Sequence, residues 1–261
     1  MKKISVMFSG FFKYKDLLME LVSRDIKIRY RRSVLGLFWT LLNPILMMTV
    51  MTLVFSGLFR FDIENFPIYF FTGHILFTFL TESTTNGMHS IVESSNLINK
   101  VYIPKYLFPL SKVLSSGVNL IFSFVAMIFV MIATGVKFYS TMLLTPLIIF
   151  YLLLLAAGLS LILASCQVFF RDTAQLYSVF TLLWMYLTPI FYPVSLLGDK
   201  LKIALTLNPM VHYITYFRNI VLDNKVPSLQ QNITCLVMGL MFFCFGLCVF
   251  YRKQDKFILH I

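Results

Sequence analysis

The chain changes from strongly cationic to uncharged near its start, and this boundary constrains its fold more than any other feature. The segment from Arg24 to Arg32, RDIKIRYRR, carries five basic residues against one acidic residue, and no ionisable side chain follows from Ser33 to Phe59. Roughly 20 predominantly apolar residues suffice to cross a bilayer as a helix, and basic residues beside them are attracted to anionic headgroups. We therefore expect a membrane surface at this boundary.

The composition extends this expectation to the whole chain. With 59% hydrophobic residues, 13% charged residues and a mean hydropathy of +0.83, the chain has too little polar side chain to cover a soluble domain. The net charge of +11 does not indicate nucleic-acid binding, because the basic residues lie beside apolar runs and outside any nucleic-acid-binding module. Membrane lipids are the expected anionic partner.

The sequence contains no motif for chemistry within the chain itself. It has no Gly-rich phosphate loop ending in Gly-Lys-Ser/Thr, no His-Glu-x-x-His and no Cys-x-x-Cys. The four cysteines lie in apolar runs, where we expect small buried residues. We therefore expect no catalytic residue, no metal and no cofactor in this chain.

Six stretches are apolar enough to be considered as transmembrane helices. The second is short unless it extends through polar residues toward Gly87. With six spans both ends lie on one side of the membrane, and that side collects sixteen of the 22 basic residues, so the positive-inside rule places both termini in the cytoplasm. The stretches are about 34–59, 67–81, 113–135, 142–166, 174–192 and 232–251.

These stretches predict an all-α polytopic membrane protein built as one domain over residues 1–261. The outer region contains an apolar stretch from Ile203 to Leu222, but its Asn208-Pro209 break and Arg218 argue against a full span. We expect two short re-entrant helices there, buried in protein. The predicted parts are a cytoplasmic or interfacial N-terminus (1–33), spans one to five (34–192), the outer re-entrant region (193–228), span six (229–251) and a cytoplasmic tail (252–261).

The basic segment near the start predicts an amphipathic interfacial helix. If it is helical, Ile26, Tyr30 and Val34 share one face and the basic side chains spread around the rest. Two interpretations stay open: the helix only anchors the chain, or it also contacts substrate headgroups or a partner.

The cytoplasmic segment from Gly87 to Lys112 carries an apolar stripe that a surface loop does not need. We expect a short amphipathic helix that Pro104 and Pro109 stop before the third span begins. The helix either docks into a partner's groove or packs under the bundle. The apolar residues are Ile91, Leu97, Ile98, Val101 and Tyr102.

Two ionisable residues of the second span, His74 and Glu82, fall at or near membrane depth. Such residues usually face a protein interior or a watery cavity. Lining a pathway and bonding to a neighbouring helix both remain open for them.

Four motifs, taken together, resemble a known family. In order and at matching separations they are similar to the membrane subunit of bacterial ABC exporters for lipid-linked polysaccharides, a family that includes O-antigen, capsule and teichoic-acid permeases. The resemblance covers the chain from about Leu17 to Tyr251. The motifs are RDIKIRYRRSVLGLFWTLLNP, SSNLINKVYIPKYLFPLSKVLSS, VFFRDTAQL, and LTPIFYP followed by LNPMVHYITYFRNIVL.

This resemblance implies an interfacial helix at Tyr14 to Arg32, a cytoplasmic coupling helix at Glu93 to Tyr102, and an outer re-entrant pair at Leu196 to Leu222. It also implies that two copies of the chain pair with two ATPase subunits, which bind ATP and Mg²⁺, and that a channel forms between the two copies. The expected ATPase-docking residues are Glu93, Asn96, Leu97, Ile98, Val101 and Tyr102.

The function that this resemblance implies is the ATP-driven export of an undecaprenyl-linked polysaccharide across the bacterial inner or plasma membrane. Basic residues at the inner surface would then receive the lipid pyrophosphate, and aromatic residues at the outer end would either close the exit or form an ordinary interfacial belt. The expected headgroup residues are Arg24, Lys27, Arg29 and Arg31, and the expected exit residues are Tyr69, Phe70, Phe191 and Tyr192.

Two other functions are alternatives to glycan export. A drug or small-lipid exporter of the same architecture shares the topology, although the 28 Phe and 13 Tyr residues favour a glycan path. An intramembrane acyl- or glycosyltransferase would need a paired acid and base or a metal site, and His74, Glu82 and His212 are scattered between the inner and outer regions.

Overall fold

Every regular element that the structure describes is a helix, as the sequence predicts. The computed structural model describes residues 14–30, 38–54, 63, 65–101, 103–193 and 205–260. The elements are α2 (Lys15–Tyr30), α3 (Phe38–Val54), α4 (Phe66–Glu93), α5 (Ser95–Ile98), α6 (Leu107–Thr134), η2 (Ser140–Leu144), α7 (Thr145–Phe169), α8 (Thr173–Leu187), α10 (Pro209–Val221), α11 (Leu229–Lys253) and η4 (Gln254–Leu259).

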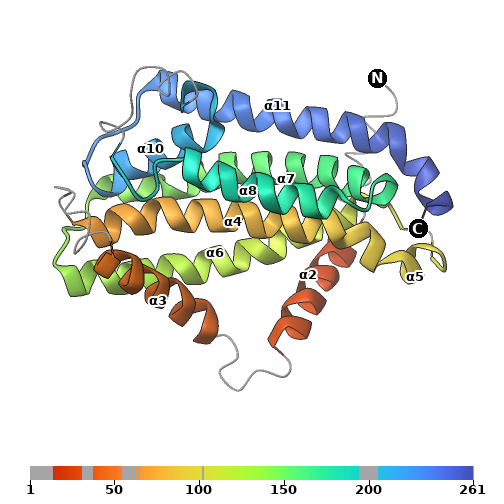
Figure 1. The fold of residues 1–261 in the computed structure, drawn as a ribbon, viewed down its shortest axis with the longest axis horizontal. Coiled ribbons are helices and arrows are strands. Elements are labelled where there is room, and N and C mark those ends of the chain that lie inside the picture. Colours follow the sequence, from red (N-terminus) through yellow and green to blue (C-terminus); the bar gives the residue numbers. More distant parts are fainter. Residues whose placement is uncertain are drawn as a thin grey trace.

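Helices α4 and α7 lie at the centre of a bundle. In Figure 1 the helices α4, α6, α7, α8 and α11 run along the long axis, with α10 at one end and α5 and the C-terminus at the other. Helix α4 packs against both α6 and α7, and α7 packs against α11. Helices α2 and α3 diverge from the bundle on the side of α6. We refer to the two ends as the α10 end and the α5 end.

Two buried apolar clusters hold the helices together. The main core joins α4, α6, α7, α10 and α11 and contains large side chains such as Phe70, Tyr216 and Phe217. The end cluster lies at the α5 end, where Leu18 of α2 and Phe257 of η4 meet residues of α4 to α7 and α11. Because lipid tails are as apolar as these side chains, close packing and not exclusion of water stabilises helix contacts within a membrane.

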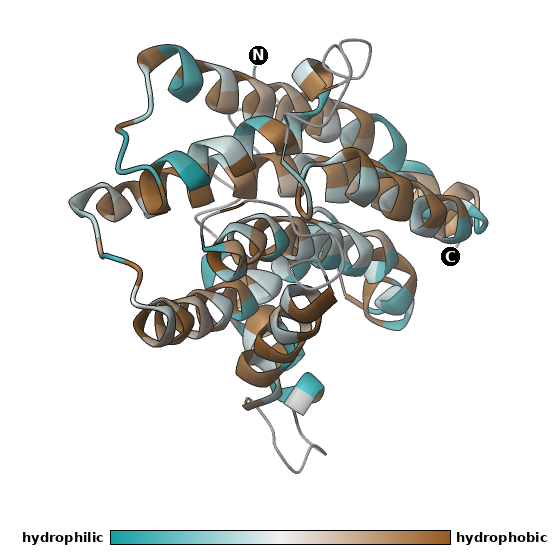
Figure 2. Cartoon of the chain, turned by 60° about the vertical axis from the view of Figure 1, so that its left-hand side comes forward, coloured by the Kyte–Doolittle hydropathy of each residue, from teal (hydrophilic) through white to brown (hydrophobic). Residues whose placement is uncertain are grey.

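Large apolar residues also cover the outside of the bundle. Phe129 and Ile132 of α6, Leu183 of α8 and Met241 of α11 are all exposed, and Figure 2 shows hydrophobic residues reaching the outward faces of the helices. Such surfaces fit a lipid environment and would be unstable in water.

The structure supports a multi-pass membrane protein. Among the described residues, three segments are long and apolar enough to cross a membrane, namely Leu107–Thr134, Ser140–Phe169 and Leu229–Leu259, and Phe38–Val54 is a shorter apolar helix. Helix α8 has 15 residues, which gives a length of about 22 Å at 1.5 Å per residue. The multi-pass all-α class is therefore confirmed, while the count of six spans stays a prediction.

Helix α4 is much longer than the predicted second span. It runs without interruption for 28 residues from Phe66 to Glu93, because its apolar side chains continue on the buried face past the polar residues, as at Met88 and Ile91. The separate amphipathic helix expected between Gly87 and Lys112 is correspondingly reduced to the four residues of α5. Pro109 lies in the first turn of α6, where a missing N–H breaks no helix bond.

Helix α10 is the described part of the predicted outer pair. The Asn208 side chain caps it by accepting a hydrogen bond from the Met210 N–H at 3.0 Å, and Pro209 opens the first turn. Seven of its residues are buried against the bundle, while its re-entrant position in the membrane stays a prediction. The preceding residues 194–204, which include the start of the predicted pair, lie outside the described residues.

Glycines set the close contact between α7 and α11. A Cβ atom on Gly158 would lie 2.3 Å from the carbonyl oxygen of Phe242, and one on Gly246 would lie 2.3 Å from the carbonyl oxygen of Gly158. Backbone atoms cannot yield as a flexible side chain can, so these positions need glycine for two membrane helices to approach so closely. Gly117 of α6 has nothing within 4 Å of its Cβ position.

We predict that Gly158→Val and Gly246→Leu each lower the unfolding temperature of the purified protein, because overpacking costs typically about 1–3 kcal/mol. Thermal unfolding in detergent measures the effect, and Gly117→Ala is the matched control with unchanged or slightly higher stability. Unfolding temperatures of both variants equal to that of the wild type would show that α7 and α11 do not meet through these glycines.

Candidate functional site

Helix α2 is attached to the bundle by ion pairs as well as by apolar contacts. Arg29 forms an ion pair with Glu82 of α4, and Glu82 also accepts a hydrogen bond from Asn119 Nδ2 of α6 at 2.7 Å. Of the two hypotheses for Glu82, bonding to neighbouring helices is the one that this geometry bears out. An anionic ligand would have to compete with this carboxylate for Arg29.

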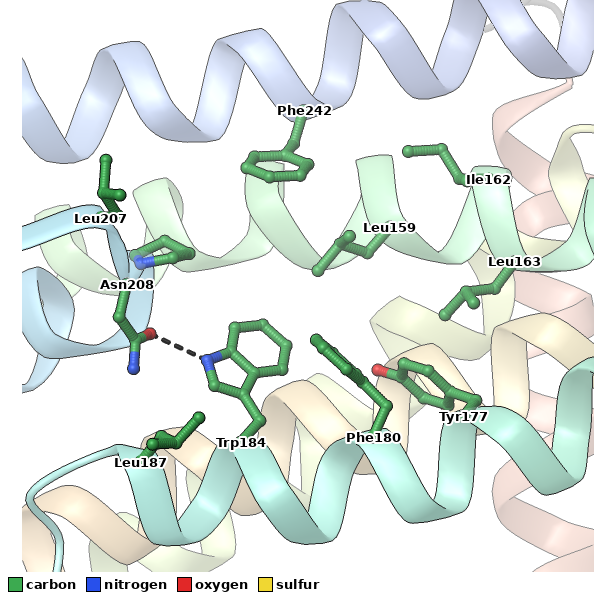
Figure 3. A pocket seen from close by; sticks show the side chains of 11 residues that line it. Leu159, Ile162, Leu163, Tyr177, Phe180, Trp184, Leu187, Leu207, Asn208 and Phe242 are labelled. Carbon is green, nitrogen blue, oxygen red and sulfur yellow. Dashed lines mark hydrogen bonds between the residues drawn. The ribbon is translucent and has the colours of Figure 1, made fainter. Parts of the chain in front are cut away.

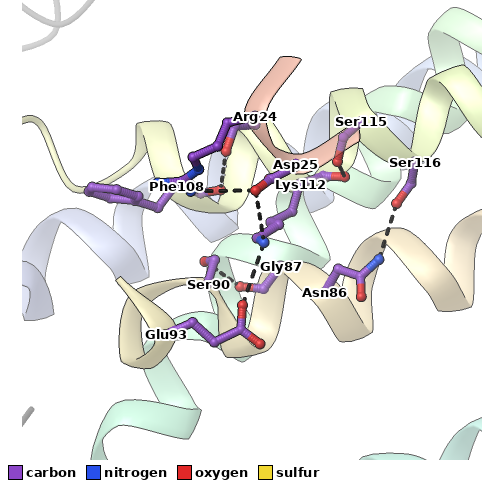
Figure 4. Close-up of polar contacts among 11 residues, drawn as sticks. Arg24, Asp25, Asn86, Gly87, Ser90, Glu93, Phe108, Lys112, Ser115 and Ser116 are labelled. Atoms are coloured by element: carbon purple, nitrogen blue, oxygen red, sulfur yellow. Dashed lines mark hydrogen bonds and ion pairs between the residues drawn. The ribbon is translucent and has the colours of Figure 1, made fainter. Parts of the chain in front are cut away.

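A second charged network lies one turn earlier on α2 (Figure 4). Lys112 Nζ of α6 lies 3.3 Å from Asp25 Oδ1 and 3.5 Å from Glu93 Oε2 at the end of α4. Arg24 Nη2 lies 3.4 Å from Asp25 Oδ1. Lys112 thus joins the predicted interfacial helix to the predicted coupling segment. Charge pairs of this kind contribute modestly where they are exposed, but here they fix the relative position of three helices.

The face that α2 turns inward differs from the predicted one. Leu18, Leu21 and Val22 are the buried residues, whereas Ile26 is only partly buried and Val34 lies outside the described residues. The apolar contacts of helix α2 therefore come from its first half, whereas its second half contacts α6 and α4 through the ion pairs of Asp25 and Arg29.

Lys27 is the predicted headgroup residue that stays available. It is exposed and makes no ion pair with a described residue. The side chain of Arg24 pairs with Asp25 but is still 43% exposed. These two basic residues line a hollow of about 400 Å³ together with Glu20 and Ile28. The fourth predicted residue, Arg31, lies outside the described residues.

The predicted ATPase-docking residues divide into a packed group and an exposed group. Ile98 is buried in the end cluster and Leu97 packs partly against it. Glu93, Asn96 and Val101 are exposed, Val101 by 51%, and Tyr102 lies outside the described residues. The apolar residues of α5 are thus used within the chain, and the surface available to a partner is mainly polar.

The C-terminal tail contributes to the same end of the molecule, which the sequence analysis missed. Phe257 is fully buried against Phe169 and Phe250, and Lys105 Nζ donates to the Gln254 carbonyl oxygen at 2.8 Å. Burial lowers the pKa of Lys105, while the nearby Asp255 acts in the opposite direction. The apolar triplet FIL after the charged RKQDK was the available signal for this packing.

At the α10 end the structure brings the four predicted exit aromatics together. The Tyr69 hydroxyl donates to the Tyr192 carbonyl oxygen at 3.0 Å, and the rings of Phe70 and Phe191 lie 5.7 Å apart at 30°. Phe70 is fully buried and Phe191 is 5% exposed. The two phenylalanines therefore do not form part of an interfacial belt within the single chain, whereas Tyr69 and Tyr192 are only partly buried.

A polar stripe runs along the open face of α4 and was not predicted as a unit. Its residues are spaced three or four apart and are exposed or partly buried, whereas 17 of the other 23 residues of α4 are buried. Helix α3 packs on one side of α4 and α8 on the other. The hydroxyl of Thr78 lies 3.5 Å from His74 Nε2. The polar stripe consists of His74, Thr78, Thr81, Thr85 and His89.

An apolar groove of about 480 Å³ lies between α7, α8 and α11 (Figure 3). Trp184 and Phe180 project into it from α8, and Phe242 faces them from α11. The indole N–H of Trp184 donates to Asn208 Oδ1 at 2.8 Å, so the end of α8 is tied to the cap of α10. The groove lies on the side of α8 that faces α7 and α11. Helix α3 lies on the opposite side of α4.

No three His, Cys, Asp or Glu side chains gather as metal ligands among the residues that the structure describes. The combination of a charged end, a polar stripe and an aromatic end fits a transport path better than an active site.

Comparisons with known proteins agree with such a role. The O-antigen export system permease protein RfbA of Myxococcus xanthus is 31% identical over 248 residues, covering 94% of this chain and 95% of that protein. The protein of the same name from Klebsiella pneumoniae is 26% identical, with 93% of each chain covered. The capsule polysaccharide export inner-membrane protein CtrC of Neisseria meningitidis is 24% identical, with 89% of each covered. The family model described as ABC-2 type transporter matches residues 16–222, and the chain therefore belongs to the ABC-2 type transporter family.

Proposed function

We propose that the chain is the membrane subunit of an ATP-driven exporter that moves an undecaprenyl-linked polysaccharide out of the cytoplasm. Similarity over nearly the whole length to permeases named for O-antigen and capsule export supports this substrate class. ATP and Mg²⁺ bind to a separate ATPase subunit in this proposal, because the chain has no phosphate loop of its own.

The polar stripe of α4 is the observation that carries the proposal. Polar and ionisable groups on an otherwise apolar membrane helix are costly against lipid and normally face the protein interior or a water-filled cavity. The chain itself does not bury this face of α4, since Thr78 and Thr85 are exposed. Hydroxyl and imidazole groups spaced along one face offer hydrogen bonds to sugar hydroxyls without forming a single tight site. We infer that the glycan passes over this face and that a second copy of the chain closes the path.

Helix α4 also provides the mechanical connection that such a transporter needs. Its 28 residues span about 42 Å at 1.5 Å per residue, and it has no break. One end carries Glu93, which adjoins α5, and the other carries Tyr69 and Phe70. Displacement of α5 by an ATPase would therefore reach the aromatic end through one rigid helix. In this arrangement the α5 end and both termini are cytoplasmic and the α10 end is outside.

The test is glycan export by the purified complex. The chain and its ATPase would be reconstituted in liposomes, and ATP hydrolysis and glycan movement would be measured with lipid-linked polysaccharide, with a short-chain lipid and with a typical amphipathic drug. Stimulation and movement with the polysaccharide alone support the proposal. Stimulation by the drug or the short lipid without glycan movement would favour the alternative, a drug or small-lipid exporter.

We predict that the paired substitution Thr78→Val and Thr85→Val slows glycan export several-fold while ATPase assembly and the unfolding temperature stay unchanged. Valine keeps the shape but removes two exposed hydroxyls from the path, and polar contacts of this kind are worth about 1 kcal/mol each. Thr234→Val on α11, at a partly buried position outside the stripe, is the control. Normal export by the paired variant would mean that the glycan does not touch this face.

We predict that the exposed part of the coupling segment carries the ATPase contact. Val101→Asp combined with Lys100→Glu should reduce co-purification of the ATPase without changing the unfolding temperature, because both side chains are exposed. Ile98→Asp should instead lower the unfolding temperature, since it buries a charge in the end cluster. Val226→Asp, an exposed valine near the opposite end, is the control. Full co-purification by the double variant would place the contact elsewhere.

We predict that Lys27 contributes to headgroup binding more than Arg29 does. A basic residue near an anionic surface is worth about 1 kcal/mol, so Lys27→Gln should raise the concentration of lipid-linked glycan for half-maximal ATPase stimulation about fivefold. Arg29→Gln should mainly lower the unfolding temperature, because it leaves Glu82 without its cation. Lys15→Gln, exposed on the first turn of α2, is the control. Equal stimulation curves for Lys27→Gln and wild type would exclude a headgroup role for Lys27.

A further inference from the structure

We propose that Arg218 is the positioning residue that holds the aromatic cluster at the α10 end in its closed arrangement. The proposal rests on the proposed function in one respect, namely that this cluster closes the path at rest. The aromatic cluster consists of Tyr69, Phe70, Phe191 and Tyr192.

The Arg218 guanidinium connects three separate segments. It belongs to the last part of α10 and donates from Nη1 to the Pro189 carbonyl oxygen at 2.8 Å. From Nη2 it reaches the Tyr69 carbonyl oxygen at 3.1 Å and the Ile190 carbonyl oxygen at 3.3 Å. Its Cζ atom also lies 3.5 Å from the centroid of the Tyr69 ring, which is a close cation–π contact. One side chain thus ties α10 to the start of α4 and to the segment that follows α8.

These contacts act directly on the aromatic cluster. Pro189 and Ile190 immediately precede Phe191 and Tyr192, so holding their carbonyl groups fixes the backbone that carries both rings. Tyr69 is held on its face by the guanidinium and through its hydroxyl by the Tyr192 carbonyl oxygen. Arg218 therefore contacts Tyr69 directly, and it contacts the backbone just before Phe191 and Tyr192.

The buried charge of Arg218 has no carboxylate to balance it among the described residues. Its Nε atom is also buried without a hydrogen-bond partner. A buried cation that is balanced only by carbonyl dipoles and a ring is costly unless the geometry is well fixed. Gly73 makes room for it, since a Cβ atom there would lie 3.2 Å from Nη2. A planar guanidinium can reach several carbonyls and stack at once, which a lysine ammonium cannot do.

Helix α10 is itself anchored to the other side of the bundle. The Tyr213 hydroxyl donates to the Cys235 carbonyl oxygen at 2.8 Å, and the Tyr216 hydroxyl donates to Asn232 Oδ1 at 2.9 Å, both on α11. The Thr141 hydroxyl of η2 donates to the Ile220 carbonyl oxygen at 2.7 Å. Arg218 therefore connects a fixed helix to the segment that carries the cluster. Any opening that separates the cluster must break or stretch these contacts.

Ion leakage through the resting protein tests the proposal. The full-length chain would be reconstituted in potassium-loaded liposomes without ATP, and potassium efflux would be followed with a potential-sensitive dye. Arg218→Lys should raise the leak about tenfold, since losing one or two charge-assisted hydrogen bonds shifts a closed–open equilibrium by about that factor. Arg218→Met should have at least the same effect. Lys225→Gln removes an exposed cation near the same end and should leave the leak at the wild-type level.

A second variant separates positioning from folding. Gly73→Ala keeps the charge of Arg218 but adds a Cβ 3.2 Å from its Nη2 and 3.3 Å from Ile190 Cγ2. It therefore crowds the junction that Arg218 holds, and it should raise the leak in the same direction with little change in unfolding temperature. Should Arg218→Met fail to fold, Arg218→Lys and Gly73→Ala carry the test. Wild-type leak rates in both of these variants, with normal unfolding temperatures, would overturn the proposal.

The outcome is independent of the glycan assay. A raised leak in proteins that do not export polysaccharide would leave the role of Arg218 intact and reject the proposed function. Normal polysaccharide export by the wild type, together with an unchanged leak in the Arg218 and Gly73 variants, would support the proposed function and reject the role of Arg218.

Discussion

The structure depends on one uninterrupted helix whose two faces meet different surroundings. The buried face of α4 carries large apolar residues from Phe70 to Ile91 and packs against α6 and α7. The open face carries the polar stripe, which neither a lipid environment nor an apolar core would accommodate without cost. The bundle therefore covers α4 on one side and leaves the other side free between α3 and α8. This asymmetry supports the two proposals made for α4, namely that the path runs over its open face and that a second copy of the chain closes it.

The sequence predicted the helices that high average hydropathy marks, but it did not predict the full length of α4, which only the periodic spacing of its apolar residues marks. The runs that became α6, α7 and α11 each contain a long apolar stretch, so their centres could be read directly from the sequence. In α4 the residues from Thr81 to Glu93 lower the average hydropathy, and the second span was therefore predicted to end early. Their spacing of three and four residues would have predicted one long helix with a polar face.

The pairing of charges could not be derived from the sequence, because the partners lie far apart in it. Arg29 and Glu82 are 53 residues apart, and Lys112 joins Asp25 to Glu93 across three helices. Each of these residues was visible as a charge near the membrane surface, but which cation is neutralised and which stays free depends on packing. The distinction matters for function, since Lys27 remains available to an anion while Arg29 already has a carboxylate partner.

Both ends of α4 are held by a basic residue that reaches over from another helix. At one end Lys112 of α6 contacts Glu93, and at the other Arg218 of α10 contacts the backbone and ring of Tyr69. In the sequence Arg218 argues against a membrane span, and in the structure its guanidinium donates hydrogen bonds to carbonyl groups of its own chain. In the proposed mechanism a push on α5 shifts α4 relative to α10, which is fixed to α11. The contacts of Arg218 with Tyr69 lie across that boundary and would be strained by such a shift.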